Sequence, residues 1–481
     1  MRGFVGVVIV LGALGIAGCA SCGDNTGPTD DPFGGLVAVS GPSPFSTTCR
    51  AGSGANAYGL EVEPQLAVDP SDDKHLVGAW QQDRWSTGGA DGLVASVSHD
   101  GGATWTSSTA AFTGCEHGTS GLRASDPWVA ITPNGTVYQA ALVFDPDSAT
   151  SMMQVARSTD GGATWAAPVI VENDDDFDIF NDKESITADP TMPDRVYLTW
   201  DRLTGVTMPM DPVGTGPMVL AIGSDGTFGS AVPVFDPGSD AQTIGNEIVV
   251  LADGTLVDVT DVITMASSND PPLTAEVVRS TDHGATWSAP VVVGQMHPLD
   301  VEDPKAELDI RTGGVLPQIA VDRVHGRLYV AWEDAAGGTK DGVVVASSAD
   351  GGETWGTPVR VDPATSNGWC PTLAALPDGT VGLLHYDDRD DDPADTARFE
   401  IAAWLATSSD GGATWSEARV TQPFDMSAAS VGGEELFLGD YEGLVATGSA
   451  GFVPFFAVAN SVDVGVDPGD IYVRPEGAGS D

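Results

Sequence analysis

The sequence predicts an all-β fold assembled from repeated four-stranded sheets, and three observations support this prediction. One octapeptide, Ser-x-Asp-x-Gly-x-Thr-Trp, occurs in five near-complete copies: Ser98–Trp105, Ser158–Trp165, Ser280–Trp287, Ser348–Trp355 and Ser408–Trp415. The aspartates of successive copies are 60, 122, 68 and 60 residues apart. β-rich runs flank the motif, as at 343–348 and 357–361. Self-similarity at a nearly constant period indicates a repeat architecture.

The motif has the composition of a tight turn between two strands. An aspartate carboxylate accepts hydrogen bonds from turn amides, and glycine supplies the positive φ that such turns require. The tryptophan then opens the next strand as a large apolar side chain. We therefore expect a structural role for the five motif aspartates, Asp100, Asp160, Asp282, Asp350 and Asp410. The doubled interval predicts a worn copy near residue 221, and Ser224–Phe228 is an incomplete one.

The octapeptide resembles the Asp-box, also called the bacterial neuraminidase repeat, of sialidase-like β-propellers. The resemblance covers 35–475 and implies a single propeller domain, because propellers grow by adding blades. It also implies that the motif turns lie on the outer rim, away from any catalytic centre. Function therefore has to be argued from other residues.

Each unit is expected to contain four strands, and seven first strands can be placed. They begin near Pro64, Pro127, Glu184, Asn246, Pro317, Pro371 and Tyr441. The seventh unit offers only three strands, at 441–447, 452–460 and 470–474. The apolar segment 36–40 would supply the fourth, closing the last blade without a long exposed edge. Seven blades are therefore favoured; six is the alternative, because the resemblance implies that catalytic sialidases usually have six.

The chain is strongly acidic, with 69 Asp and Glu against 20 Lys and Arg and a formal net charge of −49. This charge argues against nucleic-acid binding, which requires a basic surface, and against adhesion to anionic membranes. A hydrophobic fraction of 41% is enough for a sizeable core. The acidity indicates either a solvated, self-repelling surface or divalent-cation binding at a few acidic loops.

The N-terminus is expected to be a targeting segment. Arg2 precedes an apolar run at 4–17, which is too short to span a bilayer but has the length of a signal-peptide core. Ile-Ala-Gly-Cys at 16–19 resembles the bacterial lipobox, which implies lipidation of Cys19; an ordinary secretory signal is the alternative. We expect a signal peptide at 1–18, a flexible tether at 19–34 and a short tail at 476–481. The resemblance implies an exported domain anchored to a bacterial membrane, the outer one in a Gram-negative cell.

Four cysteines remain when Cys19 is set aside: Cys22, Cys49, Cys115 and Cys370. An exported chain can form disulfides. Cys49 and Cys115 occupy equivalent loops of neighbouring predicted units, which favours their pairing. Free buried cysteines are the alternative.

Asp-Arg pairs recur where second strands are predicted to end, at 83–84, 201–202 and 388–389. An arginine fork suits bidentate capture of a carboxylate, and the resemblance implies three arginines for the carboxylate of sialic acid. Arg84, Arg202 and Arg389 are therefore candidate substrate-binding residues, with Trp80 as a sugar-stacking platform. In the other interpretation, each arginine pairs with its neighbouring aspartate as a clamp between blades.

Tyr441 opens the last predicted unit, where the resemblance implies a nucleophilic tyrosine with a glutamate as its base. A carboxylate within hydrogen-bond reach would be needed, because a phenol is un-ionised near neutral pH. The candidate bases are Glu442, Glu247 and Glu184, and the candidate general acids are Asp126 and Asp83. The alternative is that Tyr441 packs in the inner ring.

One departure from the family concerns specificity. The resemblance implies an Arg-Ile-Pro motif on the first blade, but 62–66 reads Val-Glu-Pro-Gln-Leu. The first arginine of the implied triad is therefore absent from its place. Two functions stay open: an exo-acting glycoside hydrolase of sialidase type working on extracellular glycans, and a non-catalytic monomeric propeller that binds glycan or protein.

No cofactor is expected, and metal binding is left open. The acidic segment 173–184 alternates the carboxylates Asp174, Asp176 and Asp178 but lacks the glycine of an EF-hand loop. A calcium site there, or in the acidic run 387–392, is one interpretation. A solvated acidic loop is the other.

Overall fold

The computed structural model describes residues 35–47, 49, 53–115, 121–205, 218–264, 272–335, 337–431, 435–448, 451–460 and 467–475. In these ranges the chain is all-β apart from a short 3-10 helix, η2 (Met426–Ala429). None of the described elements is a helix long and apolar enough to cross a membrane. The signal peptide, Cys19, the tether, Cys22 and the tail at 476–481 lie outside the described residues.

The largest sheet is a series of three antiparallel meanders. They are joined by single residue pairs, Ala90 with Ala124 and Leu60 with Gly469. The first meander is β2 (Asn56–Asp69), β3 (Asp72–Trp85), β4 (Ala90–Ser98) and β5 (Thr106–Ser108). The second is β6 (Arg123–Ile131), β7 (Val137–Phe144), β8 (Thr150–Ser158) and β9 (Val169–Asp175). The third is β33 (Gly443–Thr447), β34 (Gly451–Ala459), β35 (Gly469–Val473) and the N-terminal β1 (Val37–Ala38).

Four further sheets repeat the same antiparallel order. The first is β10 (Ile179–Ala188), β11 (Arg195–Thr204), β12 (Met218–Ser224), β13 (Thr227–Phe228) and β14 (Val232–Phe235). The second is β15 (Ala241–Gln242), β16 (Glu247–Val250), β17 (Leu256–Thr264), β18 (Leu273–Ser280) and β19 (Val291–Met296). The third is β22 (Gln318–Asp322), β23 (Arg327–Glu333), β24 (Val343–Ser348) and β25 (Val359–Arg360). The fourth is β26 (Gly368–Ala375), β27 (Val381–Asp387), β28 (Glu400–Ser408), β29 (Ser416–Arg419) and β30 (Phe424–Asp425).

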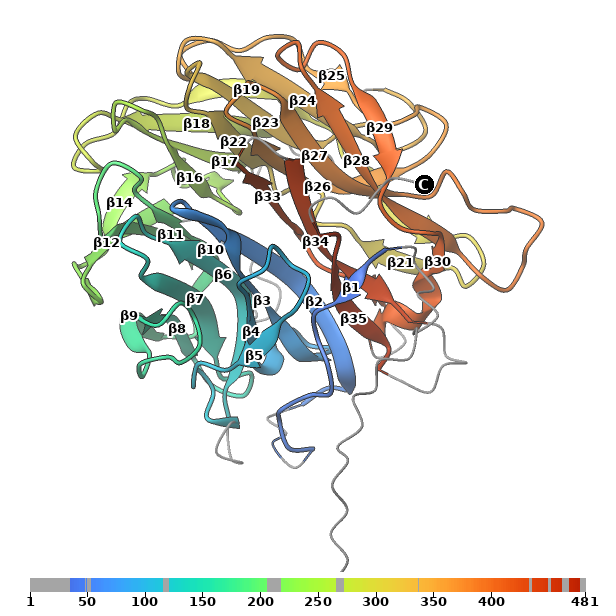
Figure 1. The fold of residues 1–481 in the computed structure, drawn as a ribbon, viewed down its shortest axis with the longest axis horizontal. Coiled ribbons are helices and arrows are strands. Elements are labelled where there is room, and N and C mark those ends of the chain that lie inside the picture. The colour runs from blue at the N-terminus through green and yellow to red at the C-terminus, as the bar shows by residue number, and fades with distance from the viewer. Residues whose placement is uncertain are drawn as a thin grey trace, which may run out of the picture. The chain divides into compact units, whose positions relative to one another are not determined.

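The first strands of successive meanders contact one another in chain order. β2 contacts β6, β6 contacts β10, and the series continues through β16, β22, β26 and β33, which contacts β2 again. In Figure 1 these strands face the middle of the drawing, whereas outer strands such as β9, β14, β19 and β29 lie toward its margin. No hydrogen-bonded sheet of the described residues closes on itself. Single backbone residue pairs join the first meander to the second and to the last, and packing between neighbouring sheets completes the rest of the circuit.

The N-terminal strand pairs with the last strand, as the sequence predicts. β1 runs antiparallel to β35, with Val37 opposite Val473 and Ala38 opposite Tyr472. Beyond the strand, the Val39 amide donates to the Ile471 carbonyl over 2.8 Å, and the Ile471 amide donates to Ser40 Oγ over 2.8 Å. The paired segment thus spans most of the predicted 36–40.

The five motif copies form the predicted turns, between the third and fourth strands of their meanders. In the copy at 348–355, Asp350 Oδ1 accepts from Ser348 Oγ at 2.8 Å and from the Thr354 amide at 2.9 Å, and Oδ2 accepts from Thr354 Oγ1 at 2.6 Å. The other four copies repeat these bonds. The donors, led by the threonine hydroxyl, lower the pKa of each motif aspartate to about 2. Each motif aspartate thus closes its own turn through these hydrogen bonds.

The incomplete copy at 224–228 forms a different turn. Ser224 pairs with Thr227, so Asp225 and Gly226 make a two-residue hairpin, with φ of 53° and 74°. Asp-Gly is favoured there because both residues tolerate positive φ. The predicted hairpin is present, but without the motif's hydrogen bonds the turn is tighter.

A mixed sheet that the repeat pattern does not predict joins two distant segments. β20 (Val301–Asp303) and β21 (Leu308–Arg311) precede the fifth first strand, whereas β31 (Ser430–Val431) and β32 (Glu435–Phe437) precede the seventh. β21 and β32 pair in parallel, with Arg311 opposite Phe437. This non-repeat sheet places Arg311 beside the first strands.

The core lies between the sheets, and a disulfide ties the first meander. Trp80, Trp200 and Trp332, each on the second strand of a meander, are fully buried. Cys49 and Cys115 form the favoured disulfide, which links the segment before β2 to the segment after β5. Cys370 is free and buried.

Removing the N-terminal strand should destabilise the protein. The Val39 side chain is only 5% exposed. A chain beginning at residue 42 loses the pairing of β1 with β35 and exposes the apolar surface that Val39 covers. We expect a loss of about 2 kcal/mol in the free energy of unfolding, the value of burying one valine side chain. Chemical denaturation checks this, with a chain beginning at residue 35 as the control. Equal stability of the two chains would show that β1 contributes nothing to the fold.

Candidate functional site

The functional site is built from bulges near the start of four first strands. β2, β6, β10 and β26 each shift register there against their neighbour. At the bulge stand Glu63, Asp126, Lys183 and Cys370, with φ between 50° and 55°. Positive φ is unfavourable for these residue types and persists only where the surroundings enforce it. The bulges also start these strands earlier than the sequence predicts.

Lys183 lies among three carboxylates from three different meanders. Its Nζ is 2.5 Å from Asp440 Oδ2, 3.6 Å from Asp126 Oδ2 and 3.7 Å from Glu63 Oε1. The side chain is only 11% exposed. Burial alone would lower the pKa of Lys183, but Asp126, Asp440 and Glu63 together raise it well above its ordinary value. Lys183 is therefore a permanent cation at this site.

Arg311 binds Asp440 from the other side. Its Nε donates to Asp440 Oδ1 over 2.8 Å, and Nη2 donates to Oδ2, so the pair is bidentate. Burial works to raise the pKa of Asp440, but Arg311 and Lys183 hold it well below its usual range. The guanidinium carbons of Arg311 and Arg84 each lie 4.8 Å from the centre of the Phe437 ring. One aspartate thus joins β10, the non-repeat sheet and the start of the last meander.

A cavity of about 470 Å³ opens beside this ion-pair cluster. Its polar wall includes Asp182, Lys183, Gln242, Asp300, Arg311, Thr312 and Asp440, and its apolar wall includes Ile244, Ile263, Leu299, Val301, Ile310, Val315 and Leu316. Burial and the neighbouring Asp126 raise the pKa of Asp182 to about 7. The volume suits a small ligand with both apolar and hydroxyl-bearing faces.

The wall at 312–316 is held from behind by Glu333 of β23. Glu333 accepts hydrogen bonds from Thr312 Oγ1 at 2.9 Å and from the Cys370 amide at 3.0 Å. Gly313 has φ of 75°, and a Cβ there would come within 2.4 Å of the Asp440 carbonyl oxygen. Only glycine allows the wall to approach Asp440 this closely.

A second, smaller cavity of about 20 Å³ adjoins the first and shares Lys183 and Leu316 with it. Glu184, Glu247 and Tyr441 line it. No other described residue donates a hydrogen bond to either carboxyl oxygen of Glu184, which is 2% exposed. Glu247 accepts only from the Ile319 amide, over 3.3 Å. Burial raises the pKa of Glu247 to about 7; burial and the nearby Asp126 raise that of Glu184 well above its ordinary value.

Tyr441 and Glu442 do not form the predicted nucleophile and base. The Tyr441 hydroxyl donates to the Pro127 carbonyl over 3.4 Å, and its ring lies 5.2 Å from that of Trp128. Burial and the surrounding carboxylates raise the pKa of Tyr441, the opposite of activation. Glu442 is occupied elsewhere, accepting from Tyr386 Oη at 2.8 Å and the Ala457 amide at 3.1 Å. Tyr441 therefore packs in the inner ring.

The three predicted arginines do not converge on one point. Arg84 is buried near the ion-pair cluster and donates to Gln81 Oε1 over 2.8 Å. Arg202 binds Asp174 of β9 bidentately, at 2.6 Å and 3.0 Å. Arg389 pairs with Asp387 and Glu417 and lies 3.8 Å from the Trp404 ring centre. Each arginine is held by a partner other than its adjacent aspartate, so both predicted interpretations need correction.

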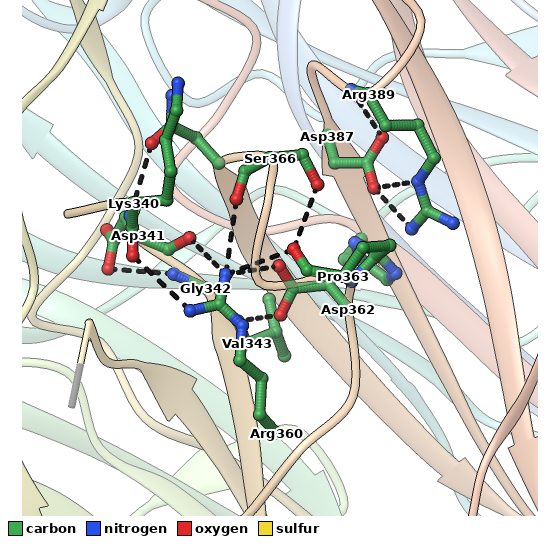
Figure 2. A network of polar contacts seen from close by, with 12 residues as sticks. Lys340, Asp341, Gly342, Val343, Arg360, Asp362, Pro363, Ser366, Asp387 and Arg389 are labelled. Carbon is green, nitrogen blue, oxygen red and sulfur yellow. Dashed lines mark hydrogen bonds and ion pairs between the residues drawn. The ribbon is translucent and has the colours of Figure 1, made fainter. Parts of the chain in front are cut away.

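Arg389 belongs to a different region, beside a clamp around Arg360. Figure 2 shows Arg389 on Asp387, and Arg360 reaching the loop at 362–366. Arg360 Nη2 donates to the Asp341 carbonyl at 2.7 Å and to Asp362 Oδ2 at 2.8 Å. These contacts fix the chain between β25 and β26. They are structural and leave neither arginine free for substrate.

The remaining predicted site residues are also placed outside the cavities. Trp80 is 1% exposed and donates to Gln82 Oε1, so it has no face for a sugar. Asp174 is bound to Arg202 and Asn181, and Asp176 accepts from the Asp178 amide at 3.1 Å. The described ranges contain no group of three or more His, Cys, Asp or Glu arranged to hold a metal ion.

The two cations of the site, Lys183 and Arg311, could not be recognised from the sequence pattern. Lys183 stands at a predicted strand start but gives no signal of its own. Arg311 lies in the interval of 68 residues between Asp282 and Asp350, which is longer than the usual 60. The longer interval reflects an insertion that carries β20 and β21, two of the four strands of the non-repeat sheet.

No known family profile matches the chain, and no curated protein is similar to it in sequence. Among solved structures, an alpha-L-arabinanase from Penicillium chrysogenum has a TM-score of 0.49 at 12% identity, covering 92% of this chain and 98% of that one. An alpha-L-arabinofuranosidase from Fusarium graminearum has a TM-score of 0.47 at 14% identity, covering 74% and 93%. A sialidase from Streptococcus pneumoniae has a TM-score of 0.45 at 11% identity, covering 71% and 67%. All three TM-scores are below 0.5, and no functional assignment is taken from them.

Asp440→Ala should be strongly destabilising, because it leaves Lys183 and Arg311 without their shared counter-charge. Breaking a buried ion pair by removing one partner costs about 3–5 kcal/mol. Asp175→Ala is the matched control, an exposed aspartate on the outer strand β9. Urea denaturation of both variants checks the difference. A loss no larger than that of the control would mean that the cluster does not hold the fold together.

Proposed function

We propose that the protein acts on glycans: it binds a sugar in the larger cavity and hydrolyses a glycosidic bond with Glu184 and Glu247. The observation that carries the proposal is that these two buried carboxyl groups share one small cavity beside the larger one and belong to no ion pair of the described residues. Two carboxyl groups flanking the scissile bond are the usual requirement for glycoside hydrolysis.

The three carboxyl groups that face Lys183 are already committed. Asp440 is held by Lys183 and Arg311, and Asp126 and Glu63 also face Lys183. A carboxylate in an ion pair is a poor proton donor and a hindered base. Glu184 and Glu247 have no such partner, so protons can move to and from them.

The protonation of the pair indicates the role of each group. Burial and the nearby Asp126 raise the pKa of Glu184 well above its ordinary value, and burial raises that of Glu247 to about 7. Near neutral pH, Glu184 therefore holds a proton for the glycosidic oxygen, and Glu247 is partly ionised. The small cavity of about 20 Å³ has room for one water. Glu247 takes a proton from this water as its oxygen bonds to the anomeric carbon and the glycosidic bond breaks.

Release of 4-nitrophenol from a panel of aryl hexosides and pentosides tests the proposal. Glu184→Gln and Glu247→Gln should each lower kcat by about 10²–10⁴ without unfolding the protein, because each removes a proton-transfer group. Glu302→Gln, an exposed change on β20, is the control. Since the base must be ionised, kcat/KM should fall about tenfold per pH unit below 7. Wild-type levels of turnover in both variants would rule out the pair.

Non-catalytic glycan binding is the second candidate, and one observation favours it. Glu184 is only 2% exposed, so a ligand in the larger cavity has to displace part of the wall to reach it. Binding measured by calorimetry without turnover on any glycoside would select this alternative.

We further propose that the meanders are the seven blades of one propeller. The closed series of contacts from β2 through β33 and the β1–β35 pairing support this arrangement. An experimental density map with six or eight sheets around the axis would contradict it.

Export and anchoring are proposed from the sequence alone. We infer that the domain is a monomer tethered to a bacterial membrane through lipid on Cys19. Metabolic labelling with a tagged fatty acid in a bacterial host should mark the wild type and not Cys19→Ala. An unlabelled wild type would contradict the anchor.

A further inference from the structure

We infer that the larger cavity selects sugars that carry no negative charge and excludes sugars with a carboxylate. The inference rests on the proposed glycan-acting function and concerns the substrate class of the same site. It is drawn from the ion pairs around the cavity and from the balance of charged groups that line it. It runs against the sialic-acid specificity that the sequence motif suggested.

The two cations in the cavity wall are already neutralised by the protein. Lys183 has three carboxylates within 3.7 Å, and Arg311 gives its Nε and Nη2 edge to Asp440. Phe437 packs against the guanidinium plane of Arg311. A ligand carboxylate would therefore compete with Asp440 for a charge that Asp440 holds bidentately.

The third cation, Arg84, stands behind the wall. It does not line either cavity, it is 3% exposed, and its Nη1 donates to Gln81. Its guanidinium lies against Phe437, the ring that Arg311 also packs against. Arg84 is therefore not part of the surface that a ligand in either cavity would contact.

Carboxyl groups outnumber cations around the two cavities. Besides the three that face Lys183, four line the cavities: Asp182, Glu184, Glu247 and Asp300. Seven carboxyl groups thus stand against the three cations Arg84, Lys183 and Arg311. Even with Glu63, Asp182, Glu184 and Glu247 all protonated, as burial favours, three carboxylates balance three cations. Each of these four groups that ionises makes the site more negative.

A sugar carboxylate that enters such a site loses its hydration without gaining an unpaired cation. Burying an uncompensated charge is strongly unfavourable. Hydroxyl groups have no such cost, because the protonated carboxyls and amides of the wall can donate to and accept from them. Charge balance therefore works as a filter on substrate class.

The test compares one glycan in two charge states. An array of neutral glycans identifies a ligand of the full chain, and the same glycan is then oxidised at its primary hydroxyl to the carboxylate. We expect the neutral form to bind at least about tenfold more tightly, the effect of roughly 1.4 kcal/mol. Equal or tighter binding of the oxidised form overturns the inference alone. Absence of binding to any glycan overturns the proposed function, and the inference with it.

A charge change at the cavity rim tests directly whether local charge selects the ligand. Asp300 is an exposed residue of the cavity wall outside the catalytic pair and the ion-pair cluster, so Asp300→Lys should fold normally. It should reduce the preference for the neutral form about tenfold at low salt, and 0.5 M salt should restore the preference by screening. Asp175→Lys makes the same change in net charge on the outer strand β9 and should leave the preference unchanged. Equal effects of the two variants would mean that local charge does not select the substrate.

Discussion

The carboxylate of Asp440 holds together three parts of the chain that the repeat alone would leave separate. It binds Lys183 from a bulge of β10 and Arg311 from the non-repeat sheet, and it stands directly before β33 of the last meander. Asp440 is the nearest counter-charge of Lys183, whose side chain is only 11% exposed, and it also orients Arg311, whose side chain is 39% exposed. Once the pair is made, the position of the wall at 312–316 follows, since Gly313 lies against the Asp440 backbone. The larger cavity is the space left beside this contact.

The ion pairs of Asp440 with Lys183 and Arg311 divide the acidic groups near the cavities into two kinds. The carboxyl groups that face Lys183 or Arg311 are neutralised by these cations and stabilise the fold. Glu184 and Glu247 lie one step further along the inner ring and form no ion pair with a described residue, so burial is the largest influence on the pKa of each. Perturbed carboxyl groups in a concave site are the usual mark of chemistry. The ion-pair cluster thereby determines which acids stay available to a ligand.

The sequence was a good guide to everything that depends on local turn chemistry. The aspartate, glycine and threonine of each motif make their hydrogen bonds within eight residues, so the five turns and the strands beside them could be predicted. The β1–β35 pairing could be predicted for another reason, because the last unit has three strands of its own and the apolar segment 36–40 is left to supply the fourth. The site depends instead on non-local geometry. The bulge at Lys183 has no distinct local sequence signature. Arg311 reaches the site only because β21 pairs with β32, which lies more than a hundred residues further along the chain. The Asp-Arg pairs misled for the opposite reason: adjacent residues on a strand point to opposite faces, so neighbours in sequence seldom pair.

The pairing of β1 with β35 has a consequence for how the chain is completed. A ribosome makes β1 first and β35 last, so the N-terminal strand waits for its partner through the synthesis of nearly the whole domain. Contacts of such long sequence separation form late, because closing a large loop costs conformational entropy before the contacts contribute any stability. Until then the last meander lacks its outer strand and an edge stays open. The chain carries a formal net charge of −49, so unfinished chains repel one another while this edge is open.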